Sequence, residues 1–232
     1  MSLKWEEHIV ETPHGKFRVT HWAKHDPHKL IAAIKCTAIR QDAAADPIIN
    51  TYSFGPHELV TRKFSGRRKP AAHYFDILRT MADKGVSIVE TPVALVQELT
   101  YGHHDLLVTL WKQKTQPLSH LLYAGGKLKV KDEARLNAMR VVAKLHAAGF
   151  SHGHLKISNF VVDEKGQTQL IDPTLVGNDP RNDGEIDYIL PGELLSGYPF
   201  IFKSQLTAAV LRGHYQKWLE IYKKQFAKRS GK

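Results

Sequence analysis

The sequence predicts an α+β protein with two unequal lobes, a β-rich one over residues 1–112 and a mainly helical one over residues 113–232. Three observations support this prediction. Apolar and polar residues alternate through much of the first half, as they do in half-buried strands. Apolar residues in the second half recur at helical spacing over two long stretches. The length of 232 residues suits one domain with two lobes.

The first part of the chain has the pattern of strands joined by turns. Lys16–Trp22 alternates apolar and polar residues after a His-Gly turn. Leu30–Ile39 is a further apolar run, partly β-branched, and we expect it to be a strand as well. Asn50–Phe54 and Glu58–Phe64 flank Gly55-Pro56, which predicts a hairpin.

A single helix interrupts these strands. Apolar residues recur at helical spacing over Ala71–Lys84, and Gly85 is a suitable stop. Val93–Glu98 and Asp105–Trp111 then return to strand character. A linker is expected near Lys112–Gln116, where the second lobe begins.

The second half contains two predicted helices. Asp132–Ala148 has one apolar face, with Asp132 as its expected N-cap and Gly149 as its stop. The last helix is predicted over Ser204–Lys228. The residues expected to face inward on that helix are Leu206, Val210, Trp218 or Leu219, Tyr222 and Phe226.

Composition limits the classes of function. The chain has 33 basic and 23 acidic residues, a net charge of +10 that favours polyanionic partners or reflects a solvated basic surface. No recognition helix or aromatic RNA-binding signature is visible, so no specific nucleic-acid partner is expected. The single cysteine, Cys36, excludes an internal disulfide and a cysteine-built zinc site. The sequence has no secretory signal pattern and no apolar run of about 18 residues, so a cytoplasmic location is expected.

The segment from Leu145 to Asp172, at and after the end of the predicted helix Asp132–Ala148, is rich in polar residues. The loop holds His152, His154, Lys156 and Asn159, and it precedes two short predicted strands, Phe160–Asp163 and Thr168–Ile171, which end on Asp172. Asn and Asp side chains supply the hard oxygen ligands that Mg²⁺ prefers. A lysine nearby can neutralise charge on a transferred phosphoryl group. The segment therefore suits phosphoryl transfer, in which positioning and electrostatics supply most of the rate.

The loop His152–Asn159 reads H-G-H-L-K-I-S-N and resembles the catalytic loop of the protein-kinase-like superfamily, H-R-D-L-x-x-x-N or H-G-D-L-x-x-x-N. The resemblance implies a two-lobed kinase-like fold that uses ATP and Mg²⁺. It makes Asn159 a magnesium ligand and Asp172 the aspartate of the D-F-G motif, although the triplet here is D-P-T. Lys156 corresponds to the lysine two residues after the catalytic acid.

Other segments fit this resemblance in order. Glu58–Phe64 resembles the third strand of the family, which makes Lys63 the lysine that contacts the α- and β-phosphates. Arg62 is an alternative to Lys63 for this contact. Neighbouring residues of a strand point to opposite faces, so only one of the two can point toward the phosphates. Ala71–Lys84 would be helix C, where Asp76 is the only acidic candidate to pair with the lysine. There is no G-x-G-x-x-G loop, and the likeness is greatest to the lipopolysaccharide-core (heptose and Kdo) kinases.

His154 occupies the position of the catalytic aspartate. Imidazole can accept a proton but adds no negative charge beside the magnesium ions. One hypothesis is an impaired phosphotransferase acting on a sugar or glycolipid hydroxyl, and the other is a pseudokinase that serves as a regulatory or binding module. The resemblance implies a nucleotide partner and an anionic sugar or glycolipid acceptor, with the protein in the cytoplasm or peripheral to the inner membrane.

Two other chemistries use the same residues. His152 and His154, with His146 nearby, have the nitrogen ligands for a zinc site. Ser151 beside these histidines suggests a nucleophile and base, but the chain lacks a G-x-S-x-G elbow around it.

Overall fold

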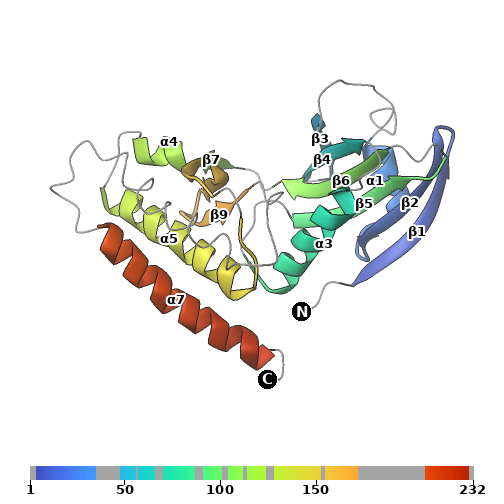
Figure 1. The fold of residues 1–232 in the computed structure, drawn as a ribbon. Coiled ribbons are helices and arrows are strands. Elements are labelled where there is room, and N and C mark those ends of the chain that lie inside the picture. Colours follow the sequence, from blue (N-terminus) through green and yellow to red (C-terminus); the bar gives the residue numbers. More distant parts are fainter. Residues whose placement is uncertain are drawn as a thin grey trace. The chain divides into compact units, whose positions relative to one another are not determined.

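The chain forms two compact units in a computed structural model that describes residues 4–34, 48–55, 57–65, 70–86, 91–100, 104–111, 114–123, 128–152, 155–171 and 207–229. One unit comprises Met1–Asp83 with Glu90–Gln113, and the other Lys84–Val89 with Lys114–Lys232. Figure 1 labels the elements of both units. Strands dominate the first unit and helices the second, which confirms the predicted α+β class.

The first unit contains a six-stranded antiparallel sheet in the order β1-β2-β5-β6-β4-β3 (Figure 1). Its strands are β1 (Trp5–Thr12), β2 (Gly15–Trp22), β3 (Ile48–Phe54), β4 (His57–Ser65), β5 (Thr91–Glu98) and β6 (His104–Trp111). The predicted strand over Lys16–Trp22 and the hairpin around Gly55 are both confirmed. Gly55 has a φ of 57°, a left-handed conformation that glycine adopts without strain.

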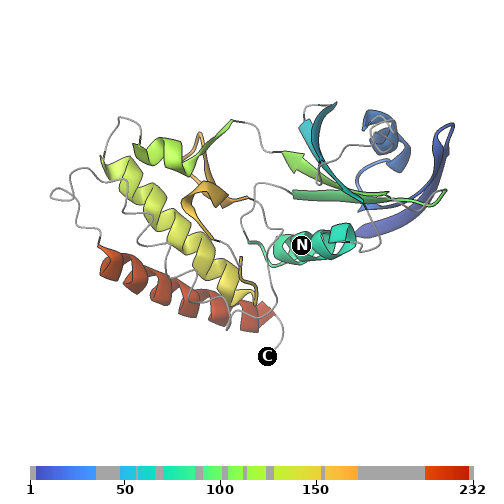
Figure 2. The ribbon, with the colours of Figure 1, turned by 45° about the horizontal axis from the view of Figure 1, so that its top comes forward.

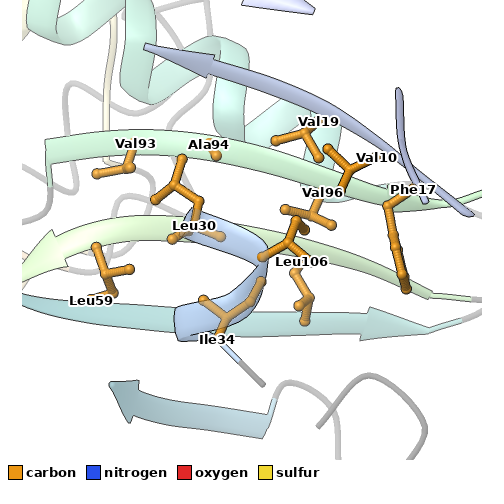
Figure 3. Packing of buried hydrophobic residues seen from close by; sticks show 12 residues of the cluster. Val10, Phe17, Val19, Leu30, Ile34, Leu59, Val93, Ala94, Val96 and Leu106 are labelled. Atoms are coloured by element: carbon orange, nitrogen blue, oxygen red, sulfur yellow. The ribbon is translucent and has the colours of Figure 1, made fainter. Parts of the chain in front are cut away.

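Two helices cover this sheet, α1 (Pro27–Ala33) on one face and α3 (Pro70–Asp83) on the other (Figure 2). Five consecutive residues of β5 are buried, as expected for a strand that is covered on both faces. The core on the α1 side is drawn in Figure 3. It consists of Val10, Phe17, Val19, Leu30, Ile31, Ile34, Leu59, Val93, Ala94, Val96, Leu106 and Val108.

Helix α1 corrects one prediction, because Leu30–Ile39 was expected to be a strand. The helix starts at Pro27 after Asp26, whose side chain accepts hydrogen bonds from the backbone N–H groups of His28 and Lys29. An aspartate N-cap followed by proline is a strong helix start. The burial of Leu30, Ile31 and Ile34 then follows helical spacing, and residues 35–39 lie outside the described residues.

The second unit combines long helices with a small sheet. Its elements are β7 (Thr115–Pro117), α4 (Leu118–Tyr123), α5 (Leu128–Ala147), the 3₁₀ turn η1 (Ile157–Asn159), β8 (Phe160–Asp163), β9 (Thr168–Leu170) and α7 (Ala208–Arg229). Strand β7 begins within the predicted linker, and β8 and β9 form the predicted hairpin. Helices α5 and α7 lie side by side (Figures 1 and 2).

Helix α5 begins at Leu128, four residues before the predicted N-cap. Asp132 therefore lies inside the helix, where its carboxylate is 3.4 Å from the guanidinium of Arg135. The side chain of Arg135 is almost fully buried, so this ion pair supplies charge compensation that a buried cation requires. Asp132 resembled a cap because an aspartate preceded the apolar stripe, but the same residue type also pairs with Arg at i+3.

The inward face of α7 differs slightly from the prediction. Leu211, Tyr215 and Tyr222 are buried, whereas Val210, expected to face inward, is exposed. Leu206 lies outside the described residues. Two hydrogen bonds attach this face to α5, one between His146 and Tyr215 and one from Arg140 to the hydroxyl of Tyr222. The face is thus set by two tyrosines whose hydroxyl groups find polar partners on α5.

None of the described helices combines the length and the apolar character that a membrane span needs.

Candidate functional site

The predicted catalytic loop follows directly from the end of α5. The N–H of Phe150 bonds to the carbonyl of Leu145 and that of Gly149 to the carbonyl of His146, the pair of hydrogen bonds that defines a Schellman motif. Gly149 has a φ of 88°, the positive value that this motif requires. The helix therefore ends at the predicted glycine, and the chain turns there into the polar segment.

His152 anchors the start of this segment. Its side chain is fully buried, and its Nε2 lies 3.2 Å from the carbonyl oxygen of Ile171. A carbonyl can only accept, so Nε2 carries the proton and donates. The ring therefore ties the start of the loop to the residue that precedes Asp172.

Asn159 is held from both sides. Its side-chain Oδ1 accepts a hydrogen bond from the backbone N–H of Lys156 at 2.9 Å, and its backbone oxygen accepts one from Ile171 at 2.7 Å. The residue is buried. An amide oxygen has two lone pairs, so Oδ1 retains one for a hard cation. Asn159 thus combines a fixed position with a suitable ligand atom.

Strands β8 and β9 form the scaffold beneath Asn159. Phe160 pairs with Leu170, and the bond between Asn159 and Ile171 extends this ladder by one step. Asp163 closes the turn, because its Oδ1 accepts from the N–H groups of two residues in the turn, each at 2.9 Å. The backbone that leads into Asp172 is consequently fixed opposite Asn159, although Asp172 itself lies outside the described residues.

Lys156 is exposed within the loop His152–Asn159, where its ammonium group is accessible to an anion. His154, the predicted catalytic position, lies outside the described residues. The described part of the loop therefore holds Asn159 and Lys156 three residues apart on a hydrogen-bonded turn. An amide oxygen and an ammonium group are the chemistry that a metal–phosphate complex needs.

The two other chemistries proposed for this loop receive no support from the described residues. Ser151 is fully buried and has no exposure for attack on a substrate. His146 places Nδ1 2.6 Å from the hydroxyl of Tyr215, and His152 uses Nε2 on a backbone carbonyl. Among the described residues, no group of three metal-ligand side chains forms around these histidines.

Strand β4 carries the two candidates for the phosphate-binding cation. Lys63 pairs with Leu106 across the β4–β6 ladder, and Arg62 pairs with Leu107. Leu106 belongs to the core on the α1 side, so Lys63 shares that face. Arg62 therefore lies on the face that α3 covers. Both side chains are buried, so each charged group requires an ion-pair or hydrogen-bond partner.

The acidic candidate on α3 does not reach the sheet. Asp76 is exposed and forms an ion pair with Arg79, one turn along the helix, at 3.1 Å. Asp76, the only acidic candidate near the middle of this helix, is therefore a poor match to the acid that pairs with the lysine in the family. The residues that α3 buries are apolar and include Phe75 and Leu78.

Asp105 is a candidate acidic partner for Arg62, and the sequence analysis did not identify it. It is buried on β6 opposite Phe64, two residues from the position opposite Arg62 and on the same face. Such diagonal pairs lie within reach of long side chains. Gln97 also donates a hydrogen bond to Asp105 at 3.3 Å. In the sequence Asp105 reads as the first polar residue of a strand, and only the register shows that it shares a face with Arg62.

The residues that line a groove of the second unit include none of the predicted site residues. The groove is lined by Asn137, Arg140, Val141, Lys144, Gln167, Thr168 and Tyr222.

No family model matches the sequence, and no curated protein matches it. Solved structures do match. One is a divergent kinase lacking the glycine-rich loop that regulates membrane ultrastructure of the Toxoplasma parasitophorous vacuole, with a TM-score of 0.51 and 14% identity. Another is the bifunctional kinase-methyltransferase WbdD, with a TM-score of 0.50 and 18% identity.

The chain has a kinase-like fold. The match to the divergent kinase covers 70% of this chain and 62% of that one, and the match to WbdD covers 92% and 49%. This chain therefore spans about half to three fifths of the length of those two. The kinase-like fold predicted from the loop His152–Asn159 is confirmed, and at these identities the likeness concerns the fold alone.

Proposed function

We propose that this chain binds ATP with Mg²⁺ and is related to the lipopolysaccharide-core kinases, with phosphoryl transfer to a sugar or glycolipid hydroxyl impaired by His154. The hydrogen-bonded position of Asn159 in a kinase-like fold is the observation that carries this proposal. Residues 1–112 would form the N-terminal lobe and residues 113–232 the C-terminal lobe.

The proposal gives each residue one role. Asn159 and Asp172 would hold magnesium, because amide and carboxylate oxygens suit that ion. Lys156 would lie near the transferred phosphoryl group, where its charge stabilises developing negative charge. Lys63 would contact the α- and β-phosphates, and Arg62, which points to the opposite face of β4, is the alternative for this role.

The proposed acceptor rests on the net charge of the chain and on the resemblance of its loop to those of the lipopolysaccharide-core kinases. The net charge of +10 favours an anionic molecule, and the loop resembles those of kinases that act on lipopolysaccharide sugars. A sugar or glycolipid hydroxyl at the inner membrane surface combines both properties. The protein would then be cytoplasmic or peripheral to that membrane.

A pseudokinase is the second candidate, and His154 favours it. A neutral imidazole in place of a carboxylate leaves the two metal charges less compensated and provides a different base for the acceptor hydroxyl. Such a protein would bind nucleotide and act as a regulatory or binding module.

Thermal unfolding with ATP and Mg²⁺, compared with ATP alone, tests nucleotide binding in both candidates. We expect a magnesium-dependent rise in Tm, because a ligand that binds only the folded state stabilises it. The Lys156→Ala variant should weaken the response, whereas Lys165→Ala, an exposed lysine in the β8–β9 turn, should retain it. The absence of a response to ATP, GTP and their magnesium complexes would contradict the proposal.

The His154→Asp variant separates the two candidates. Transfer of labelled phosphate from ATP to a glycolipid extract should be weak or absent in the natural chain. A rise of about 100-fold in the variant is expected if the base is the missing part, since general-base catalysis contributes about 10²–10⁴-fold. Full activity in the natural chain would exclude the pseudokinase, and no activity in either protein would favour it.

A further inference from the structure

Three side chains capable of binding a metal meet on the β1–β2 hairpin. Glu6 lies directly opposite His21 in the register, and His8 follows Glu6 by two residues on β1. Because side chains alternate along a strand and cross-strand partners share a face, all three lie on one face of the sheet. One carboxylate oxygen and one nitrogen from each imidazole lie within 4.8 Å of one another.

His21 is already arranged as a metal ligand. Its Nδ1 lies 3.0 Å from the backbone oxygen of Trp22, which can only accept, so Nδ1 carries the proton. The lone pair is therefore on Nε2. That atom is buried and has no hydrogen-bond partner, and the residue is only 1% exposed. Histidines that bind metals commonly donate the other ring N–H to a backbone carbonyl in this way.

Glu6 and His8 form the more exposed part of the cluster. His8 Nε2 is 3.7 Å from Glu6 Oε2, and the two rings of His8 and His21 have centroids 5.0 Å apart. The other oxygen of Glu6 accepts a hydrogen bond from the ammonium of Lys4 at 2.7 Å, which holds the pKa of Glu6 below its ordinary value. A carboxylate oxygen is one of the ligand types that bind Zn²⁺ in proteins.

We propose that Glu6, His8 and His21 bind one divalent transition-metal ion, for which Zn²⁺ is the best-suited species. Two imidazoles and one carboxylate form a ligand set typical of zinc and a poor one for Mg²⁺, which prefers oxygen. Bonds of about 2.0–2.2 Å require the three ligand atoms to approach one another more closely than 4.8 Å. The part-exposed Glu6 and His8 side chains can rotate toward the fixed His21 to achieve this.

The bound ion would fasten an edge strand to its neighbour. Strand β1 lies at the edge of the six-stranded sheet, and β2 is its partner there. Three protein ligands would leave a fourth position for water, on the side where His8 is about half exposed. The site shares no residue with the set proposed to hold magnesium, so the proposal can be tested independently of the kinase-like function.

Zinc titration of the full chain after chelator treatment tests the proposal. We expect one equivalent of Zn²⁺ per chain by competition with a chromogenic chelator, a higher Tm, and no such effect of Mg²⁺. His8→Asn should lower the zinc affinity by at least 10–100-fold, the loss that weakening a ligand shell commonly causes. His28→Asn is the matched control, because His28 is an exposed histidine of α1 outside the cluster.

Zinc-edge X-ray absorption identifies the ligands directly. The natural chain should show two imidazole nitrogens at about 2.0–2.1 Å, and the His8→Asn protein should show fewer. Weak binding that is equal in the His8 and His28 variants would mean that the 14 histidines bind zinc diffusely, and it would overturn the proposal. Both variants should keep the response to ATP with Mg²⁺, which distinguishes this site from the proposed nucleotide site.

Discussion

The predicted site residues of the second unit and those of the first unit differ in how closely their surroundings match the sequence-based expectation. In the second unit, Asn159 and His152 are both buried and both bonded to backbone groups around Ile171. In the first unit, the acid expected on α3 is exposed, and Lys63 shares the face of the α1-side core. The described loop residues are therefore fixed by hydrogen bonds to the backbone, whereas no described acidic residue of α3 is buried against the strand that carries Lys63 and Arg62.

Loss of the loop anchor should have the largest effect on stability. We expect His152→Ala to lower the free energy of unfolding by about 2–4 kcal/mol, because it leaves a cavity and an unpaired carbonyl at Ile171. Urea unfolding measures this change. His120→Ala, at an exposed position of α4, should stay within about 0.5 kcal/mol. A loss in His152→Ala as small as the control's would show that the ring does not anchor the loop.

Removal of a proposed magnesium ligand should have the next largest effect. Asp172→Asn is expected to lower the affinity for ATP with Mg²⁺ by about 100-fold, because it removes a charged oxygen ligand. Isothermal titration calorimetry with and without Mg²⁺ checks this. Glu164→Gln is the control, since Glu164 is an exposed carboxylate of the neighbouring turn. Equal affinities in the two variants would remove Asp172 from the site.

The two cationic candidates on β4 can be tested by replacing each with methionine, which keeps the length of the side chain. Lys63→Met should weaken ATP binding about tenfold or more, a typical cost of losing a charge-assisted contact, because Lys63 is the proposed phosphate-binding cation, and Arg62→Met should weaken it less. The same calorimetric titration compares the two. A greater loss in Arg62→Met would transfer the role from Lys63 to Arg62.

The smallest effect is expected at the turn that supports the loop. Asp163→Ala removes an acceptor for the N–H groups of Lys165 and Gln167, which should cost about 1 kcal/mol of stability. Urea unfolding again provides the measurement. Magnesium-dependent ATP binding should survive, because the strand ladder between Asn159 and Ile171 remains. A complete loss of binding would show that the turn itself positions the ligands.

Local patterns predicted much of the fold. The alternation of Lys16–Trp22, the turn at Gly55 and the stop at Gly149 each reflect forces that act within a few residues. Other elements depend on distant partners. Strand β1 has four charged or imidazole side chains among its first seven residues and becomes a strand through its pairing with β2. Helix α1 was missed although Asp26 and Pro27 signal a helix start.

The candidate site likewise contains residues that a local pattern could locate and residues whose positions depend on distant partners. The loop motif located Asn159 and Lys156, because the spacing of the residues in one short segment carries that information. The faces of Lys63, Arg62 and Asp105 depend on the register of β4 against β6, which no local pattern specifies. The metal cluster on β1 and β2 was missed for the same reason, since it exists only when two strands are aligned.

The position of β1 at the edge of its sheet also bears on how the protein avoids self-association. An edge strand offers unpaired backbone groups to other chains, and charged side chains along it discourage such pairing. Glu6, Glu7 and Glu11 lie on β1, and Lys16 and Arg18 on β2 form ion pairs with two of them. The charged side chains along β1 therefore disfavour the addition of a strand from another chain, and an apolar edge strand would favour such addition and aggregation.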